Sequence, residues 1–99
     1  MRKEELIHQI AISFFNPLRS EHICRREENH QDGKIITFQL KPESYPKRCE
    51  AISFRIDSDG EVHYHEMIRG KSNLTREIIL ARLEKVNRLI RGEKACSQG

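Results

Sequence analysis

The sequence predicts one α+β domain in which two amphipathic helices, one near each end of the chain, pack on one face of an antiparallel meander of three to four strands. Apolar residues recur at helical spacing near both ends of the 99-residue chain. Between these regions, segments rich in β-branched and aromatic residues alternate with turn sequences. The expected order is helix, strand, strand, strand, strand, helix around a single core, because a chain of this length cannot bury two.

The first helix is expected over residues 2–15. Glu4 and Glu5 would lie in its first turn, where the helix dipole favours acidic side chains. Asn16 and Pro17 would end it, because the residue before a proline is pushed out of the α conformation. The apolar stripe that predicts this helix consists of Leu6, Ile7, Ile10, Ala11 and Phe14.

Strands are expected between the helices. Segment 20–27 has Ile23 as its strong apolar residue and is predicted as an edge strand. A turn sequence over residues 28–33 leads into residues 34–40, where β-branched and aromatic residues predict a strand. Residues 41–48 contain two prolines and are expected to form a loop.

A hairpin is expected over residues 50–68, and its apolar residues predict its register. Opposed side chains must share a face, so Ile56 should pair with Val62. This pairing leaves residues 58–60 as a three-residue turn in which Gly60 takes a positive φ. The face toward the helices would carry Ile52, Phe54, Ile56, Val62, Tyr64 and Ile68, and the opposite face Ser53, Arg55, His63, His65 and Met67.

The last helix is expected over residues 73–91. Ser72 or Asn73 would cap its start, and Gly92 would end it. Its apolar stripe has one face only, so it should pack on the sheet beside the first helix. The stripe consists of Ile79, Leu83, Val86 and Ile90.

The composition predicts a small soluble protein of the cytoplasm. No apolar run approaches the roughly 18 residues that span a membrane, and acidic residues stand where a signal peptide would become apolar. The three cysteines show no close pair, which fits reduced thiols. The domain is expected to span residues 1–92, with a flexible tail over residues 93–99. Size and charge richness would suit a bacterial or phage accessory protein.

Catalytic constellations are not evident in the sequence. Cys49 follows the bases Lys47 and Arg48, but a catalytic thiol also needs a base within hydrogen-bond reach. The sequence therefore predicts a protein that is not an enzyme, with no catalytic residue, no cofactor and no small-molecule substrate.

A metal site is one alternative, because His63 and His65 alternate along a strand and would project to the same side. Glu61 could supply a third ligand, whereas Arg55 opposite His63 would repel a cation. Two histidines facing solvent are the preferred interpretation, since this spacing is common.

Nucleic-acid binding is another alternative. Basic residues are concentrated between residues 69 and 94, although the net charge is only +3. The start of the last helix could hold phosphate through backbone N–H groups and nearby cations. An ordinary solvated helix explains the same charges. The phosphate contacts would be Arg69, Lys71, Arg76, Lys47 and Arg48.

Protein binding is the preferred hypothesis. Several apolar residues lie off the main helix stripes or on the sheet face away from the helices. Such a surplus indicates a partner surface, although scattered exposed apolar residues are also normal on a protein surface. The sequence thus predicts a small regulatory or adaptor protein that binds either an unknown protein or a second copy of itself as a homodimer. The predicted interface residues are Ile12, Phe15, Leu74, Leu80 and Met67.

Overall fold

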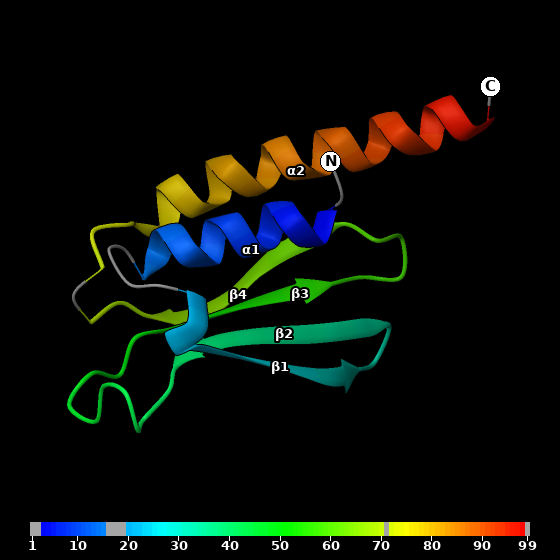
Figure 1. Ribbon diagram of the computed structural model, residues 1–99. Coiled ribbons are helices and arrows are strands. Elements are labelled where there is room, and N and C mark those ends of the chain that lie inside the picture. The colour runs from blue at the N-terminus through cyan, green and yellow to red at the C-terminus, as the bar shows by residue number, and fades with distance from the viewer. Residues whose placement is uncertain (1–2, 16–19, 71, 99) are drawn as a thin grey trace.

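The computed structural model describes residues 3–15, 20–70 and 72–98. The chain forms a helix, four strands and a second helix, which confirms the predicted order (Figure 1). A short 3-10 helix, Ser20–His22, precedes the first strand. The elements are α1 (Lys3–Phe14), β1 (Ile23–His30), β2 (Gly33–Leu40), β3 (Ala51–Ile56), β4 (Val62–Ile68) and α2 (Arg76–Gln98).

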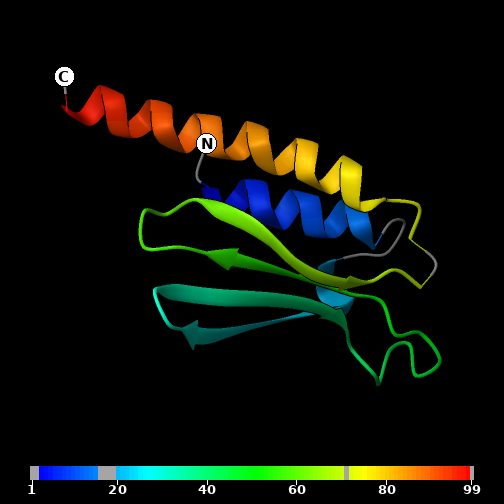
Figure 2. The same cartoon turned by 180° about the vertical axis from the view of Figure 1, so that it is seen from behind.

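The two helices lie on the same side of an antiparallel sheet whose strand order is β1-β2-β3-β4 (Figures 1 and 2). α2 packs over β4, and α1 lies beside α2. In both views β1 is the strand farthest from the helices, and its side chains from Arg25 to His30 are exposed. The described residues place no helix or strand over the other face of the sheet.

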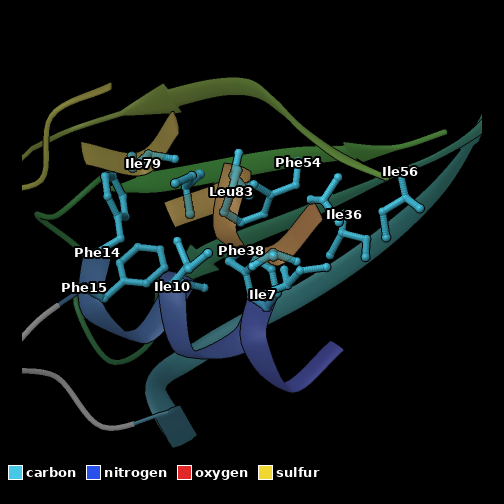
Figure 3. Packing of buried hydrophobic residues seen from close by; sticks show 14 of the residues in the cluster. Ile7, Ile10, Phe14, Phe15, Ile36, Phe38, Phe54, Ile56, Ile79 and Leu83 are labelled. Atoms are coloured by element: carbon cyan, nitrogen blue, oxygen red, sulfur yellow. The ribbon is translucent and has the colours of Figure 1, made fainter. Parts of the chain in front are cut away.

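The core lies between the helices and the sheet (Figure 3). Phe38 and Phe54, from adjacent strands, meet edge to face with their ring centroids 6.2 Å apart, and Phe14 and Phe15 do the same at 5.0 Å. Such pairs stabilise a core beyond their buried area. The helices contribute Ile7, Ile10, Ala11, Phe14, Ile79, Leu83, Val86 and Ile90, and the strands Ile36, Phe38, Leu40, Ile52, Phe54, Ile56 and Val62.

The limits of α2 differ from the prediction at both ends. Thr75 caps the helix, because its Oγ1 accepts a hydrogen bond from the N–H of Ile78 at 3.4 Å. Ser72 instead accepts from the N–H of Leu74 in the preceding turn. Gly92 does not end the helix, which continues to Gln98, so residues 93–98 are helical. Glycine permits a left-handed cap but does not require one, and Gly92 is not among the glycines with positive φ.

β1 and β2 form a longer hairpin than predicted. β1 reaches His30, which pairs with Gly33 across a turn formed by Gln31 and Asp32. Residues 28–30 were expected in the turn because they are polar. Backbone pairing continues through them because the helices leave this end of β1 open to solvent, so no apolar side chain is needed there.

The β3–β4 turn has the predicted register. Ile56 pairs with Val62, and the N–H of Asp57 donates to the carbonyl of Glu61 at 3.0 Å. Gly60 has a φ of 87°, a conformation that glycine adopts without strain. The predicted three-residue turn is therefore confirmed.

A β-bulge changes the second half of β4. Phe54 pairs with Tyr64, but Ser53 pairs with Glu66, so His65 is an extra residue in the ladder. Beyond the bulge, each residue of β4 lies on the opposite face of the sheet from the one that simple alternation predicts. The predictions that Met67 faces away from the helices and that Ile68 faces them are wrong: Met67 packs against the core and Ile68 is 55% exposed.

Candidate functional site

The sheet face opposite the helices is a candidate binding surface, which we call the open face. Strand pairing arranges its side chains in three rows that each cross all four strands. A hollow of about 340 Å³ lies over this face and is lined by residues from all three rows. The first row is Cys24, Gln39, Ala51 and Ile68, the middle row is Arg26, Thr37, Ser53 and Glu66, and the last row is Glu28, Ile35, Arg55 and His63.

The centre of the open face is neutral and made of short side chains. The hydroxyls of Thr37 and Ser53 share a hydrogen bond of 3.0 Å, and Ser53 is only 4% exposed. Ala51 next to Ser53 adds another short side chain, while Ile68 stands exposed on the edge strand. A surface of this kind can approach another protein closely without burying a charge at its centre.

Charges stand at the margins of the open face. Arg26 donates from Nη2 to Oε1 of Gln39 at 2.7 Å, and Glu66 at the opposite edge is exposed. Among the residues that the structure describes, no ion pair involves Arg26, Glu28, Arg55 or Glu66. These four charges are therefore available to an external partner.

The helix side of β1 shows the contrasting arrangement. Glu27 accepts from Arg25 at 2.5 Å and from Lys34 at 3.5 Å. The charges of Arg25 and Lys34 lower the pKa of Glu27. On this side of the strand the charges thus neutralise one another within the chain.

A second hollow, of about 490 Å³, lies between α1 and this side of β1. Its rim carries Glu4, Glu5 and His8, and its floor consists of Ile7, Ile36 and Phe38. These floor residues belong to the core, and the charged side chains of Arg25 and Glu27 also line the hollow.

Both edges of the sheet are protected against strand addition. At the β4 edge, the buried Asn87 of α2 accepts from the N–H of Val62 at 2.7 Å and donates to its carbonyl at 2.9 Å. The bulge at His65 interrupts the same edge. The β1 edge carries charged side chains of both signs, including Arg26 and Glu28. Charges and bulges on edge strands oppose pairing with another chain.

His63 and His65 both lie on the open-face side of β4, as expected. Nε2 of His63 donates to Oδ2 of Asp57 at 2.7 Å, and His65 stands exposed at the bulge. No group of three or more His, Cys, Asp or Glu side chains that could hold a metal occurs within residues 3–15, 20–70 and 72–92. The histidine spacing alone therefore assembles no metal site in that part of the chain.

Asp57 organises the turn next to His63. Its Oδ1 accepts from the backbone N–H groups of Asp59 at 2.9 Å and Glu61 at 3.1 Å. The hydrogen bond from His63 lowers the pKa of Asp57, and these two N–H groups lower it further. The carboxylate thus acts as a structural anchor of the turn.

Two of the predicted phosphate contacts lie in the loop before β3. Nε of Arg48 donates to Oε1 of the buried Glu50 at 2.8 Å, and its guanidinium lies 5.5 Å from the ring centre of Tyr45. Lys47 is exposed. The charge of Arg48 is therefore used within the fold, and Lys47 alone of this pair extends into solvent.

The other predicted phosphate contacts surround the start of α2. Arg69 is exposed and its Nη2 lies 3.5 Å from the carbonyl of Ser72. The guanidinium of Arg76 lies 5.4 Å from the ring centre of Tyr64. Lys71 lies outside the described residues. Arg69, next to Gly70, lies in the segment that adjoins the one carrying Lys47 and Glu50.

The predicted interface residues do not form one patch. Phe15 is 0% exposed and belongs to the core, so its prediction as a surface residue is wrong. Met67 packs on the core because of the bulge, and Leu74 also packs there. Ile12 is half-buried, and Leu80 on α2 is 42% exposed.

The residues that sequence reasoning missed are Arg26, Glu28, Glu66 and Ile68. A signal for the first two was present, since alternate positions of β1 carry opposite charges. No local signal marks Glu66 and Ile68, because their side depends on the bulge at His65.

No helix in the described part of the chain is long and apolar enough to span a membrane. The sequence matches no protein-family model, and no curated protein or solved structure shows significant similarity to it.

Proposed function

We propose that this protein is a small non-enzymatic regulatory or adaptor protein that binds another protein chain through the open face. One observation carries the proposal: the two helices cover one face of the sheet, and the other face combines a neutral centre, an exposed Ile68 and charges that form no ion pair among the described residues. A neutral centre inside a charged margin is the usual composition of a protein interface.

The surroundings of the open face support the same function. Strand addition is opposed at β4 by Asn87 and at β1 by charged side chains. A partner would therefore contact the sheet through side chains on its face and not through backbone pairing at its edges.

Two matched substitutions test the proposal. Ile68 and Leu89 are almost equally exposed, at 55% and 54%, but lie on β4 and on α2 respectively. Tagged wild-type protein, Ile68→Asp and Leu89→Asp are cross-linked in lysate of the source cell, and the bound chains are identified by mass spectrometry. We expect Ile68→Asp to lose the bound chain, because a carboxylate placed in an apolar contact must be desolvated.

Leu89→Asp should retain the same bound chain, which excludes a general effect of added charge. Loss of the bound chain with Leu89→Asp and its retention with Ile68→Asp would contradict the proposal. That result would place the contact at the groove between the helices, which Leu89 lines.

Nucleic-acid binding is the second candidate function. The observation that favours it is the contact between two basic segments: a side chain at Gly70 would lie 2.4 Å from Cγ of Glu50, so the segment after β4 adjoins the one that carries Lys47. Arg69 and Lys47 would then contact phosphates from one end of the sheet.

Salt dependence tests this second function, because phosphate contacts release counterions. Binding to duplex DNA, duplex RNA and single strands is measured by fluorescence anisotropy at low and at physiological salt. Affinity should fall steeply with salt and fall again in the variant Lys47→Glu. No binding at low salt would exclude the function.

A further inference from the structure

We infer that the chain bound by the open face is a second copy of this protein, related by a twofold axis that lies in the interface, runs parallel to the strands and passes between β2 and β3. The inference rests on the proposed function and specifies its partner. Homodimers of this kind use the same patch on both subunits, so every contact occurs twice.

Rotation about this axis exchanges β1 with β4 and β2 with β3, and it keeps each row of the open face at its own level. In the middle row, Arg26 then faces Glu66 of the second copy. Thr37 faces Ser53 of the second copy in the same row. The neutral centres of the two copies therefore pack against each other. Arg26 and Glu66, at the ends of the row, form pairs of opposite charge between the copies.

The other rows are compatible with the same axis. In the last row Glu28 faces His63 of the second copy and lies next to its Arg55. In the first row Cys24 faces Ile68, and Gln39 faces Ala51. No pair of like charges is opposed in any row.

The alternative in-plane axis, perpendicular to the strands, is disfavoured by the same charges. That axis keeps each strand opposite its own copy and exchanges the first row with the last. Arg26 would face Arg26 and Glu66 would face Glu66 along the middle row. Juxtaposed like charges oppose association, so the charge pattern selects the axis parallel to the strands.

The size of the face predicts a dimer that dissociates readily. Four strands about 4.8 Å apart, with about seven residues of about 3.4 Å each, give a planar face of roughly 450 Å² per copy. Stable interfaces bury about 800 Å² per partner. We therefore expect a reversible dimer whose dissociation constant lies in the micromolar range. The two sheets would pack face to face about 10 Å apart.

Charge reversal at the two ends of the middle row tests both the partner and the axis. Sedimentation velocity over a concentration series is measured for wild type, Arg26→Glu, Glu66→Arg and the combined variant. Each single reversal opposes like charges twice per dimer and should weaken dimerisation roughly tenfold or more. The combined variant should dimerise like wild type, because its two charges have exchanged places.

Mixing the two single variants gives a further test. Arg26→Glu makes both ends of the middle row acidic, and Glu66→Arg makes both ends basic. The two variants should therefore form a heterodimer with each other more readily than either dimerises alone. The matched control is reversal of Glu84 and Arg88, which form an exposed pair on α2 with N···O 2.8 Å. Glu84→Arg and Arg88→Glu should leave dimerisation unchanged, and circular dichroism verifies that each variant is folded.

Three results would overturn the inference: a wild type that stays monomeric at the highest concentration, single reversals that dimerise like wild type, or a combined variant that stays monomeric. These results differ from a failure of the proposed function. A monomeric wild type whose cross-link to a different protein is lost in Ile68→Asp refutes the second copy as partner and retains the open face as the binding surface.

Discussion

Asn87 and Val62 are joined by two hydrogen bonds at the outer edge of the sheet. The amide of Asn87 accepts from the N–H of Val62 at 2.7 Å and donates to its carbonyl at 2.9 Å. A side chain of α2 thereby satisfies both backbone groups of Val62, which a fifth strand would otherwise pair with at this position. The contact also fastens the helix to the strand, since both residues are buried.

Asn87→Ala should lower the free energy of unfolding by about 2–3 kcal/mol, because it leaves two buried backbone groups without partners. The variant should also aggregate more readily, since the β4 edge becomes available for pairing. Urea unfolding and light scattering on storage measure the two effects. Arg88→Ala, at the exposed neighbouring position, is the control and should change stability by less than about 0.5 kcal/mol. Equal stabilities of the two variants would show that the amide contact contributes nothing.

Two glycines should respond in opposite directions to alanine. A Cβ at Gly33 would lie 1.8 Å from the carbonyl oxygen of Ile56, so Gly33→Ala must push β2 and β3 apart and should cost more than about 2 kcal/mol. A Cβ at Gly92 meets nothing within 4 Å inside the helix, so Gly92→Ala should stabilise by about 0.5–1 kcal/mol. Thermal unfolding of both variants tests the pair. A stabilising Gly33→Ala would contradict the close strand approach.

Asp57 should make stability depend on pH in the acid range. Its folded pKa lies below the ordinary 3.8 because of the hydrogen bond from His63 and the turn N–H groups. The contribution of the Asp57 carboxylate to the free energy of unfolding is therefore complete above the ordinary pKa and is lost as pH falls through the folded pKa. Asp57→Asn should lose no more than about 1 kcal/mol at neutral pH, since a partly exposed pair is screened.

The stability difference between wild type and Asp57→Asn should shrink as the pH falls below about 4, in urea unfolding measured at several pH values. The same measurement on Asp32→Asn, which replaces an exposed carboxylate in the β1–β2 turn, is the control for removing a surface charge. A difference that grows toward low pH would contradict the sign derived for Asp57.

Phe15 should behave as a core residue. Phe15→Ala is expected to lower the free energy of unfolding by about 3–5 kcal/mol, because the ring is fully buried against Phe14. Ile12→Ala, at the half-buried position one turn earlier, should cost clearly less. Chemical unfolding of both variants makes the comparison. If Phe15→Ala lowered the free energy of unfolding by less than about 1 kcal/mol, the burial of this ring in the core would be contradicted.

The fold was predictable wherever one face of an element is buried. The hairpin turn is the best example, because Ile56 and Val62 must share the core face and this requirement alone sets the loop length. β1 was the weakest prediction for the complementary reason. The helices do not cover most of it, so its sequence carries no apolar alternation and only its backbone pairing reveals it as a strand.

The ends of α2 were mispredicted because several residues could fill each role. Ser72, Asn73 and Thr75 can all accept an N-terminal hydrogen bond, and the position of the chain after β4 selects Thr75. Gly92 could end a helix or lie within one. A side chain at this position would meet nothing within 4 Å, so no packing requirement distinguishes the two alternatives.

The candidate site was predictable only in part. Ser53, Arg55, His63 and His65 follow from strand alternation and were placed on the side away from the helices, where they lie. Glu66 and Ile68 lie on the open face because of the bulge. The sequence of β4 alone does not reveal this bulge, because it is defined by the pairing with β3. The relation between Arg26 and Glu66 also requires the strand order, because these residues stand on opposite edges of the sheet.

The bulge at His65 reverses the alternation of buried and exposed residues along β4. Up to Tyr64 the even-numbered residues serve the interior, and after the extra residue the odd-numbered Met67 does. Two adjacent apolar residues, Met67 and Ile68, can therefore serve opposite sides of the protein. Deleting one residue at this point would exchange interior and exterior while leaving the composition nearly unchanged, so the number of residues in the strand matters here as much as their chemistry.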